Sequence, residues 1–306
     1  MINLSKSFKN KKVIVTGHTG FKGSWLSIWL KYLGAKVIGV SNEILNNPSN
    51  FEISKLRNKM SHNIFDVRNQ KKLFNLIKKN KPDFIFHLAA QSLVKKSYLK
   101  PMETFETNAI GTLNLLESLK NYNINKICSV VIITSDKSYK NLELDRGYKE
   151  DDILGGYDPY SASKACAELI IQSYLKSFME TKKNIRISVA RAGNVIGGGD
   201  WSENRIIPDC MRSIKSKKKL ILRFPKSTRP WQHVLEALYG YLILAIKQKN
   251  NAKLNGGTFN FGPNSSYNKT VLELIDELNV TWPSISSVIK VLDTSKKEAN
   301  LLQLAC

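Results

Sequence analysis

A glycine-rich turn between an apolar run and an amphipathic pattern most constrains the fold of this chain. Residues 13–16 read Val-Ile-Val-Thr, and Gly17, Gly20 and Gly23 follow in the spacing G-x-x-G-x-x-G. Apolar residues then recur at helical spacing up to Gly34, a residue typical of a helix C-terminus. The stretch therefore predicts a strand, a tight turn and a helix, the unit that opens a doubly wound parallel α/β sheet.

Each glycine has a separate expected role. Gly17 allows the tight turn, Gly20 lets the backbone approach a pyrophosphate, and Gly23 lets the helix pack closely on the strand. Unpaired N–H groups at the helix N-terminus would then face the phosphates of a dinucleotide. A glycine triplet of this kind can also be a tight turn and nothing more, so the cofactor prediction depends on later residues.

Length and composition narrow the class of protein. With 306 residues, 42% of them hydrophobic, the chain can form one large or two modest domains. No apolar run approaches the ~18 residues of a membrane span, and residues 1–12 lack the apolar centre of a signal peptide. We therefore expect a cytoplasmic protein without membrane association. The four cysteines and four histidines show no metal-ligand spacing, so neither disulfides nor a metal site is expected.

The net charge of +22 raises the question of nucleic-acid binding. Only nine of the 47 cationic residues are Arg, and Lys is spread over nearly every segment. The densest clusters, such as residues 78–81 and 215–219, carry no interleaved aromatic residues for base stacking. We expect no nucleic-acid partner and assign the charge to solvated surface that also attracts anionic small molecules.

Acidic residues after the next two predicted strands suggest which dinucleotide binds. Glu43 follows the strand at residues 36–40 and loosely fits the position that bonds the adenosine ribose, and no Arg stands ready for a 2′-phosphate. NAD is therefore favoured. Asp66 lies in a predicted strand at residues 63–67, where it could accept from the adenine amino group or cap a helix at residues 69–79. The sequence leaves both roles open.

Polar residues collect where later strands end. The strand at residues 129–133 is followed by Thr134-Ser135-Asp136-Lys137, at the sheet edge where open α/β sheets bind ligands. Tyr160 opens a predicted helix running to about residue 179, and Lys164 lies four residues on, so both share one helix face. A nearby cation would lower the pKa of the phenol and make Tyr160 a usable base.

These motifs together resemble the extended short-chain dehydrogenase/reductase superfamily and, within it, most of all the CDP-glucose 4,6-dehydratases. The resemblance runs from about Phe8 to the last residue. Its motifs are residues 16–23, 88–91, 136–137, 160–164, 191–201 and 229–234.

The resemblance implies tightly held NAD, a nucleotide-sugar substrate, and a homodimer or homotetramer formed through helices that include the Tyr160 helix. It implies an NAD-binding domain at residues 1–190 and a sugar-nucleotide domain at 191–306, with 234–262 packing back on the first. The implied cofactor-binding residues are Gly17, Thr19, Gly20, Phe21, Gly23, Asp66, Leu88, Ala89, Ala90, Tyr160 and Lys164. The implied substrate-binding residues are Gln91, Ser92, Asn194, Arg205, Arg229 and His233, with Arg229 on the diphosphate.

The implied reaction converts a nucleotide-activated glucose to its 4-keto-6-deoxy product, a step of deoxysugar biosynthesis such as that of O-antigen lipopolysaccharide. Tyr160 takes the proton of the 4-hydroxyl, Thr134 positions that hydroxyl, and a hydride passes to NAD. The new ketone acidifies C5, so Lys137 can remove the C5 proton while Asp136 protonates the departing 6-hydroxyl. The hydride then returns to C6.

Two departures from related patterns limit the transfer of roles. The dTDP-glucose 4,6-dehydratases carry Asp-Glu where Asp136-Lys137 stands here, so the identity of the C5 base stays open between these two residues. Members of the family also continue past the segment that matches residues 298–306. We therefore expect an incomplete substrate domain and exposed apolar surface around residues 301–304.

Two other functions fit parts of the pattern. A nucleotide-sugar 4-epimerase would share NAD, Tyr160 and Lys164, but it needs no acid and base for elimination, which Asp136 and Lys137 supply. A non-catalytic dinucleotide-binding module could use the same fold without keeping Thr134, Tyr160 and Lys164 together.

Overall fold

The computed structural model describes residues 2–44, 48–222, 224–264, 267–282, 287–289 and 303–306. Its centre is a seven-stranded sheet in the order β11-β6-β5-β4-β1-β2-β3, and every neighbouring pair is parallel. The strands are β1 (Lys12–Thr16), β2 (Lys36–Ser41), β3 (Ser61–Ile64), β4 (Phe84–His87), β5 (Cys128–Ile133), β6 (Ile185–Ala192) and β11 (Thr258–Phe261). The predicted doubly wound α/β class is confirmed, and the strand order reverses between β1 and β4, where such sheets bind ligands.

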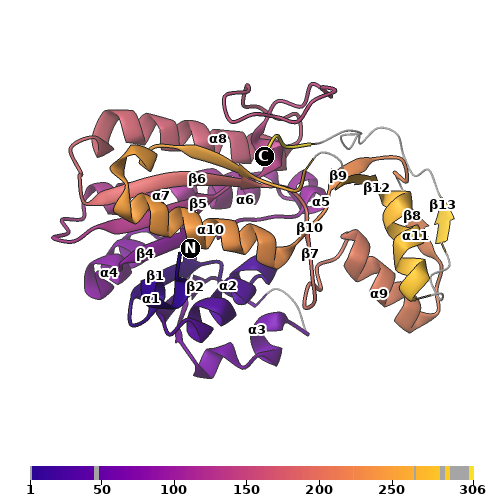
Figure 1. Cartoon of the computed structure of the whole chain (residues 1–306), viewed down its shortest axis with the longest axis horizontal. Coiled ribbons are helices and arrows are strands. Elements are labelled where there is room, and N and C mark those ends of the chain that lie inside the picture. The colour runs from indigo at the N-terminus through magenta and orange to yellow at the C-terminus, as the bar shows by residue number, and fades with distance from the viewer. Residues whose placement is uncertain (1, 45–47, 223, 265–266, 283–286, 290–302) are drawn as a thin grey trace.

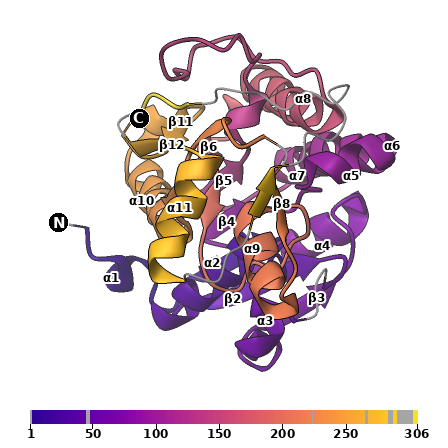
Figure 2. The same ribbon diagram turned by 90° about the vertical axis from the view of Figure 1, so that its right-hand side faces the viewer.

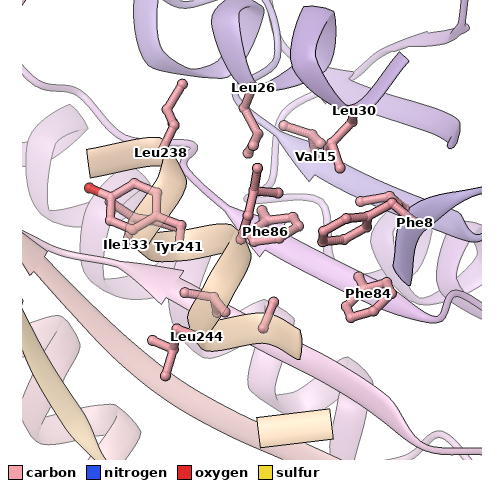
Figure 3. Close-up of a cluster of buried hydrophobic side chains, with 14 of the residues drawn as sticks. Phe8, Val15, Leu26, Leu30, Phe84, Phe86, Ile133, Leu238, Tyr241 and Leu244 are labelled. Atoms are coloured by element: carbon pink, nitrogen blue, oxygen red, sulfur yellow. The ribbon is translucent and has the colours of Figure 1, made fainter. Parts of the chain in front are cut away.

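Helices cover both faces of this sheet (Figure 1). One face carries α1 (Leu4–Phe8), α2 (Phe21–Tyr32) and α10 (Val234–Asn250), and the other carries α4 (Gln70–Asn80), α7 (Gly111–Lys120) and α8 (Pro159–Tyr174). Figure 3 shows Leu26 and Leu30 of α2 converging with Leu238 and Tyr241 of α10 on the strand residues Phe84 and Phe86. Burial of these apolar side chains fixes α2, and with it the glycine turn, against the sheet.

Smaller elements lie beside the sheet. The short helices are α3 (Asn50–Ile53), α5 (Val94–Leu99), α6 (Pro101–Phe105), α9 (Ile206–Ser216) and α11 (Val271–Thr281). The short strands are β7 (Val195–Ile196), β8 (Leu220–Leu222), β9 (Thr228–Pro230), β10 (Gln232–His233), β12 (Asn268–Thr270) and β13 (Ser287–Ile289). Figure 2 shows α9, β8 and α11 grouped together, and Cys210, Leu220, Leu222 and Ile275 form their own apolar core.

The later part of the chain crosses between the two regions. After β9 and β10, α10 packs on the sheet, and β11 pairs with β6 at the sheet edge. The division at residue 190 stays a prediction, but the sheet and its helices draw on residues from both sides of that point.

Two local predictions need correction. The strand predicted at residues 63–67 ends at Ile64, because only residues 61–64 pair with β2 and the chain then turns toward α4. Leu304 was expected to be exposed but is only 2% exposed, since it packs against Tyr139 and Tyr148. The backbone of Tyr148 donates to Gln303 and accepts from Ala305, which holds this segment in place. Leu301 and Leu302 lie outside the described residues.

Candidate active site

A cavity of about 450 Å³ opens at the carboxyl ends of the strands, between the sheet and the region of α9. Its lining includes every predicted site residue except His233. The lining residues predicted from sequence are Gly17, Thr19, Gly20, Phe21, Gly23, Asp66, Leu88, Ala89, Ala90, Gln91, Ser92, Thr134, Asp136, Lys137, Tyr160, Lys164, Asn194, Arg205 and Arg229. Segments far apart in sequence therefore meet at one site.

The glycine turn has the geometry of a phosphate cradle. Gly17 has a φ of +72°, and a Cβ there would lie 2.8 Å from the backbone nitrogen of Ala89. A Cβ on Gly23 would lie 2.0 Å from the carbonyl oxygen of Gly17, so no side chain fits. Gly20 is the N-cap of α2 and offers no side-chain cap, which leaves the first N–H groups of the helix available to an anion.

Thr19 ties this turn to the end of β2. Its hydroxyl donates to the carbonyl of Glu43 at 2.6 Å and lies 2.7 Å from the hydroxyl of Ser41. Since Glu43 also lines the cavity, this contact holds the predicted ribose-binding segment beside the glycine turn.

Asp66 is not a helix cap, contrary to one of its two predicted roles. The N-cap of α4 is Asn69, whose side chain accepts from the backbone of Lys72 at 3.0 Å. The carboxylate of Asp66 instead pairs with Arg68 at 2.8 Å. The chain turns between Asp66 and Asn69, which brings the amide and not the carboxylate to the helix end. The adenine contact of Asp66 stays a prediction.

Tyr160 and Lys164 lie in the first turns of α8. Asp158 caps this helix by accepting from the backbone N–H groups of Tyr160 and Ser161, both at 3.0 Å. The amine of Lys164 donates to the carbonyl of Ile133, at the end of β5, over 3.5 Å. Burial lowers the pKa of Lys164 to about 8 and raises the pKa of Tyr160 to about 12. The sequence predicted a lowered phenol pKa, but the chain's own side chains do not produce one, because desolvation outweighs the nearby charges.

Ser135, which the sequence analysis left without a role, is the hydroxyl beside Tyr160. Its hydroxyl opposes the rise of the Tyr160 pKa that burial causes. It donates to the carboxylate of Asp136 at 2.9 Å. Thr134, the residue predicted to position the substrate hydroxyl, instead donates to Glu168 at 2.7 Å. Successive residues of an extended strand point to opposite sides, so only one of these two hydroxyls can face Tyr160.

Glu168 organises a fully buried network behind the site. Arg191 donates to both of its oxygens from Nε at 2.9 Å, and each side chain is only 1% exposed. Ser138 also donates to this carboxylate at 2.7 Å. The network fixes the end of β5, α8 and β6 to one another, and so holds the segment from Thr134 to Ser138 in position.

Asp136 and Lys137 both reach the cavity. A short 3₁₀ turn from Asp136 to Ser138 follows β5, and this turn overrides the alternation that would separate the two side chains. Asp136 is 2% exposed, and its Oδ2 has no hydrogen-bond partner within the described part of the chain. Burial raises the pKa of this carboxyl, while the charges of Lys137, Arg229 and Lys22 oppose the rise.

The predicted substrate residues differ in what they contact. Arg205 pairs with Asp200 at 3.0 Å and donates to Ser92 at 3.2 Å, which closes one wall of the cavity. Arg229 is buried, and its charge acts on the carboxyl of Asp136. Its contact with the diphosphate stays a prediction. Asn194 lies on the same wall.

The side chains of Gln91 and His233 make hydrogen bonds that support local structure. Both amide hydrogens of Gln91 are used, one by the carbonyl of Leu93 and one by Thr104, so this side chain holds its own loop. His233 is exposed, caps α10 by accepting from the backbone of Leu235 at 3.3 Å, and lies outside the cavity lining. The substrate-binding role of His233 stays a prediction. The cap role is an additional finding, and Glu236, the first-turn acid of its capping box, was the available signal.

Lys22 is a second residue that sequence reasoning passed over. It lines the cavity from the first turn of α2, and its amine donates to the hydroxyl of Tyr241 over 3.5 Å. Its place within the glycine motif was the signal that could have identified it.

Other site types find no support among the described residues. No group of three or more His, Cys, Asp or Glu side chains there could hold a metal ion. Within the same residues, no helix is long and apolar enough to cross a membrane.

The fold and the arrangement of the glycine turn, Ser135, Tyr160 and Lys164 define an extended short-chain dehydrogenase/reductase. The chain belongs to the GDP-mannose 4,6 dehydratase family, whose model matches residues 14–296. It is 45% identical to the CDP-glucose 4,6-dehydratase of Salmonella typhimurium over 99% of this chain and 85% of that protein. It is 31% identical to the dTDP-D-glucose 4,6-dehydratase of Dictyostelium discoideum over 81% of this chain and 58% of that protein.

Solved structures support the fold. The UDP-glucose 4-epimerase of Thermotoga maritima has a TM-score of 0.81 at 21% identity, over 96% of this chain and 89% of that chain. The dTDP-glucose 4,6-dehydratase of Bacillus anthracis, solved with NAD, has a TM-score of 0.78 at 23% identity, over 96% and 88%. Epimerases and dehydratases thus share this fold, and the choice between them depends on the site.

Proposed function

We propose that this chain is an NAD-dependent nucleotide-sugar 4,6-dehydratase that acts on CDP-glucose. The observation that carries the proposal is that Asp136 and Lys137 reach the same cavity as Tyr160 and Ser135. Tyr160 and Ser135 suit oxidation of an alcohol, and Asp136 and Lys137 suit elimination of water. The 45% identity to a CDP-glucose 4,6-dehydratase supports the cytidine nucleotide.

NAD fits the residues present. The glycine turn packs too closely on neighbouring backbone for side chains at Gly17 and Gly23, and the helix after Gly20 begins without a side-chain cap. Thr19 holds the segment of Glu43 beside this turn. NAD supplies a hydride acceptor that becomes a hydride donor later in the same turnover. Lys164 and Tyr160 line the same cavity as the turn, so we place the reactive end of the dinucleotide beside them.

The side chains divide the proton transfers between them. Tyr160 accepts the proton of the sugar 4-hydroxyl. Ser135, which lines the same cavity and acts on the pKa of the phenol, positions the 4-hydroxyl in place of Thr134. Lys137 removes the C5 proton once C4 is a ketone. Asp136 donates a proton to the departing 6-hydroxyl, a task suited to a carboxyl whose pKa is raised by burial.

Incubation of the NAD-loaded protein with CDP-glucose, and separately with UDP-glucose, tests this function. We expect a 4-keto-6-deoxy product from CDP-glucose, detected by mass as the loss of one water. A product of unchanged mass with inverted C4 would indicate a 4-epimerase. NAD binding without turnover of either sugar would indicate a binding module.

We also propose that the enzyme is a cytoplasmic homo-oligomer in a pathway that makes deoxysugars, such as those of O-antigen lipopolysaccharide. Exposed apolar side chains on the neighbouring elements α5, α6 and α8 support self-association. They are Tyr98, Leu99, Met102 and Leu169. Light scattering at several protein concentrations tests this, with a dimer or tetramer expected and a monomer at all concentrations as the contrary result.

A further inference from the structure

Lys22 occupies a position unlike that of a surface lysine. It is the second residue of α2, and its side chain extends into the cavity beside Tyr241, a fully buried residue of α10. The amine lies 3.5 Å from the Tyr241 hydroxyl and 6.0 Å from the centre of its ring. Lys22 thus brings a charge from the phosphate-binding turn to the interior of the catalytic site.

No carboxylate pairs directly with this amine. Among the ion pairs between described residues, none includes Lys22. The charged groups that face it are Asp136 from the turn after β5, Lys164 from α8 and Arg205 from the start of α9. Asp136 attracts the ammonium, whereas the two cations repel it. A largely buried charge without a direct partner costs stability, and such perturbed groups cluster at functional sites.

The position of Lys22 matters because of how charge moves in the proposed reaction. When the sugar is oxidised, the C4–H bond breaks, its electron pair and hydrogen pass to C4 of the nicotinamide ring, and Tyr160 receives the hydroxyl proton. The ring changes from a cation to a neutral group. A fixed positive charge nearby raises the free energy of the oxidised ring relative to the reduced ring.

We propose that Lys22 is a further functional residue of this site, whose ammonium charge favours hydride transfer from the sugar to the bound nicotinamide. The proposal rests on the proposed dehydratase function and extends it to a residue that contacts neither Tyr160 nor Asp136 directly. Lys22 lines the same cavity as Tyr160 and Lys164, which places its charge close to where the hydride moves. Burial lowers the pKa of Lys22 to about 8, which leaves most of the amine protonated at neutral pH.

A sugar that can be oxidised but not dehydrated isolates this step. CDP-6-deoxyglucose has no 6-hydroxyl to lose, so the enzyme and this sugar reach an equilibrium between bound NAD and bound NADH. We expect the NADH-to-NAD ratio to fall roughly tenfold in Lys22→Met, the effect of removing one charge at roughly 10 Å with an effective dielectric constant of about 20. Lys22→Arg keeps the charge and should stay close to the wild-type ratio.

The matched control is Lys249→Met, which removes a lysine charge at the opposite edge of the sheet. Lys249 pairs with Asp83 at 3.4 Å, before the start of β4, whereas the cavity lies at the carboxyl ends of the strands. This variant should keep the wild-type ratio. All four proteins are compared at one fixed neutral pH, because the oxidation itself releases a proton.

Cyanide provides a probe that needs no sugar. Its carbon donates an electron pair to C4 of the bound nicotinamide and so neutralises the ring as hydride does. The dissociation constant of cyanide from the NAD-loaded protein should rise roughly tenfold in Lys22→Met, by the same charge argument. If wild-type protein responds to cyanide but neither oxidises CDP-6-deoxyglucose nor dehydrates CDP-glucose, the proposed function fails while the role of Lys22 is still measured.

Two results would overturn the inference. One is an unchanged NADH-to-NAD ratio and an unchanged cyanide constant in a Lys22→Met protein that holds its full complement of NAD. The other is loss of NAD from Lys22→Met with retention in Lys22→Arg, which would make Lys22 a phosphate anchor. The NAD content of each purified variant, measured after denaturation, separates the two.

Discussion

Replacing Glu168 by Gln should destabilise the protein strongly, although the new side chain has almost the same shape. Glu168 and Arg191 are each 1% exposed, and the carboxylate neutralises the guanidinium through bonds from Nε and Nη2. Removing one partner of a buried ion pair costs about 3–5 kcal/mol, because the other charge stays buried and unpaired. Arg191 keeps a hydrogen bond to the Glu150 carbonyl at 2.9 Å and a stacking contact with Tyr139 at 4.5 Å, which favours the lower value.

Thermal unfolding followed by circular dichroism measures this effect. For a chain of this size, about 3 kcal/mol corresponds to a fall in the melting temperature of roughly 5 °C. Glu52→Gln is the matched control, since its ion pair with Arg57 leaves the two side chains 46% and 51% exposed. An exposed pair contributes about 0–1 kcal/mol, so this variant should melt within roughly 2 °C of wild type.

The double variant Glu168→Met with Arg191→Met makes the test decisive. Removing both charges also removes the unpaired guanidinium, so the double variant should be less destabilised than Glu168→Gln alone. A Glu168→Gln protein that melts with wild type would refute the reasoning. A double variant whose loss of stability equals the sum of the losses at two independent sites would also refute it. Buried partners of one network should not have additive effects on the free energy of unfolding.

Three further predictions follow from the site. Tyr160→Phe should lower turnover of CDP-glucose by about 10²–10⁴-fold while NAD stays bound, and wild-type turnover would remove Tyr160 from the base role. Lys137→Met should let bound NADH accumulate with CDP-glucose while water loss stalls; wild-type exchange of the C5 hydrogen with heavy water would leave Asp136 as the candidate base. Acidification from pH 6.5 toward 4 should destabilise the wild type, because burial lowers the pKa of His18 to about 4 and the unfolded chain therefore binds the proton first. The melting temperature of His18→Asn should fall less over that range, and an equal fall would contradict this assignment.

The glycine turn and the strand-ending polar residues were enough to predict the fold class and most of the cavity. Periodicity and glycine spacing are local properties, and parallel strands bring their carboxyl ends to one edge whatever the loops do. Gly17, Asp136 and Tyr160 therefore met as predicted. The family and the proposed activity also followed from motifs that lie on this edge.

What the sequence could not settle was the direction of individual side chains. Thr134 and Ser135 offer two hydroxyls in succession, and only the pairing of β5 with its neighbours decides which one faces Tyr160. His233 was predicted only as a substrate ligand, and the structure shows that it also caps α10. Each case concerns a polar group with more than one available partner, and tertiary geometry chooses between those partners.

The pKa values of Tyr160 and Lys164 also depend on the folded structure and could not be predicted from the sequence. The spacing of Tyr160 and Lys164 suggests a phenol made acidic by an ammonium, yet in the folded chain burial moves both pKa values toward the neutral forms. Desolvation acts on every buried group, whereas a favourable charge acts only at short range. The positive charge of oxidised NAD beside Tyr160 would oppose the effect of burial on the phenol and favour its ionised form. In the proposed mechanism, bound NAD would therefore supply the charge that makes Tyr160 a base, which no spacing of residues in the chain could have shown.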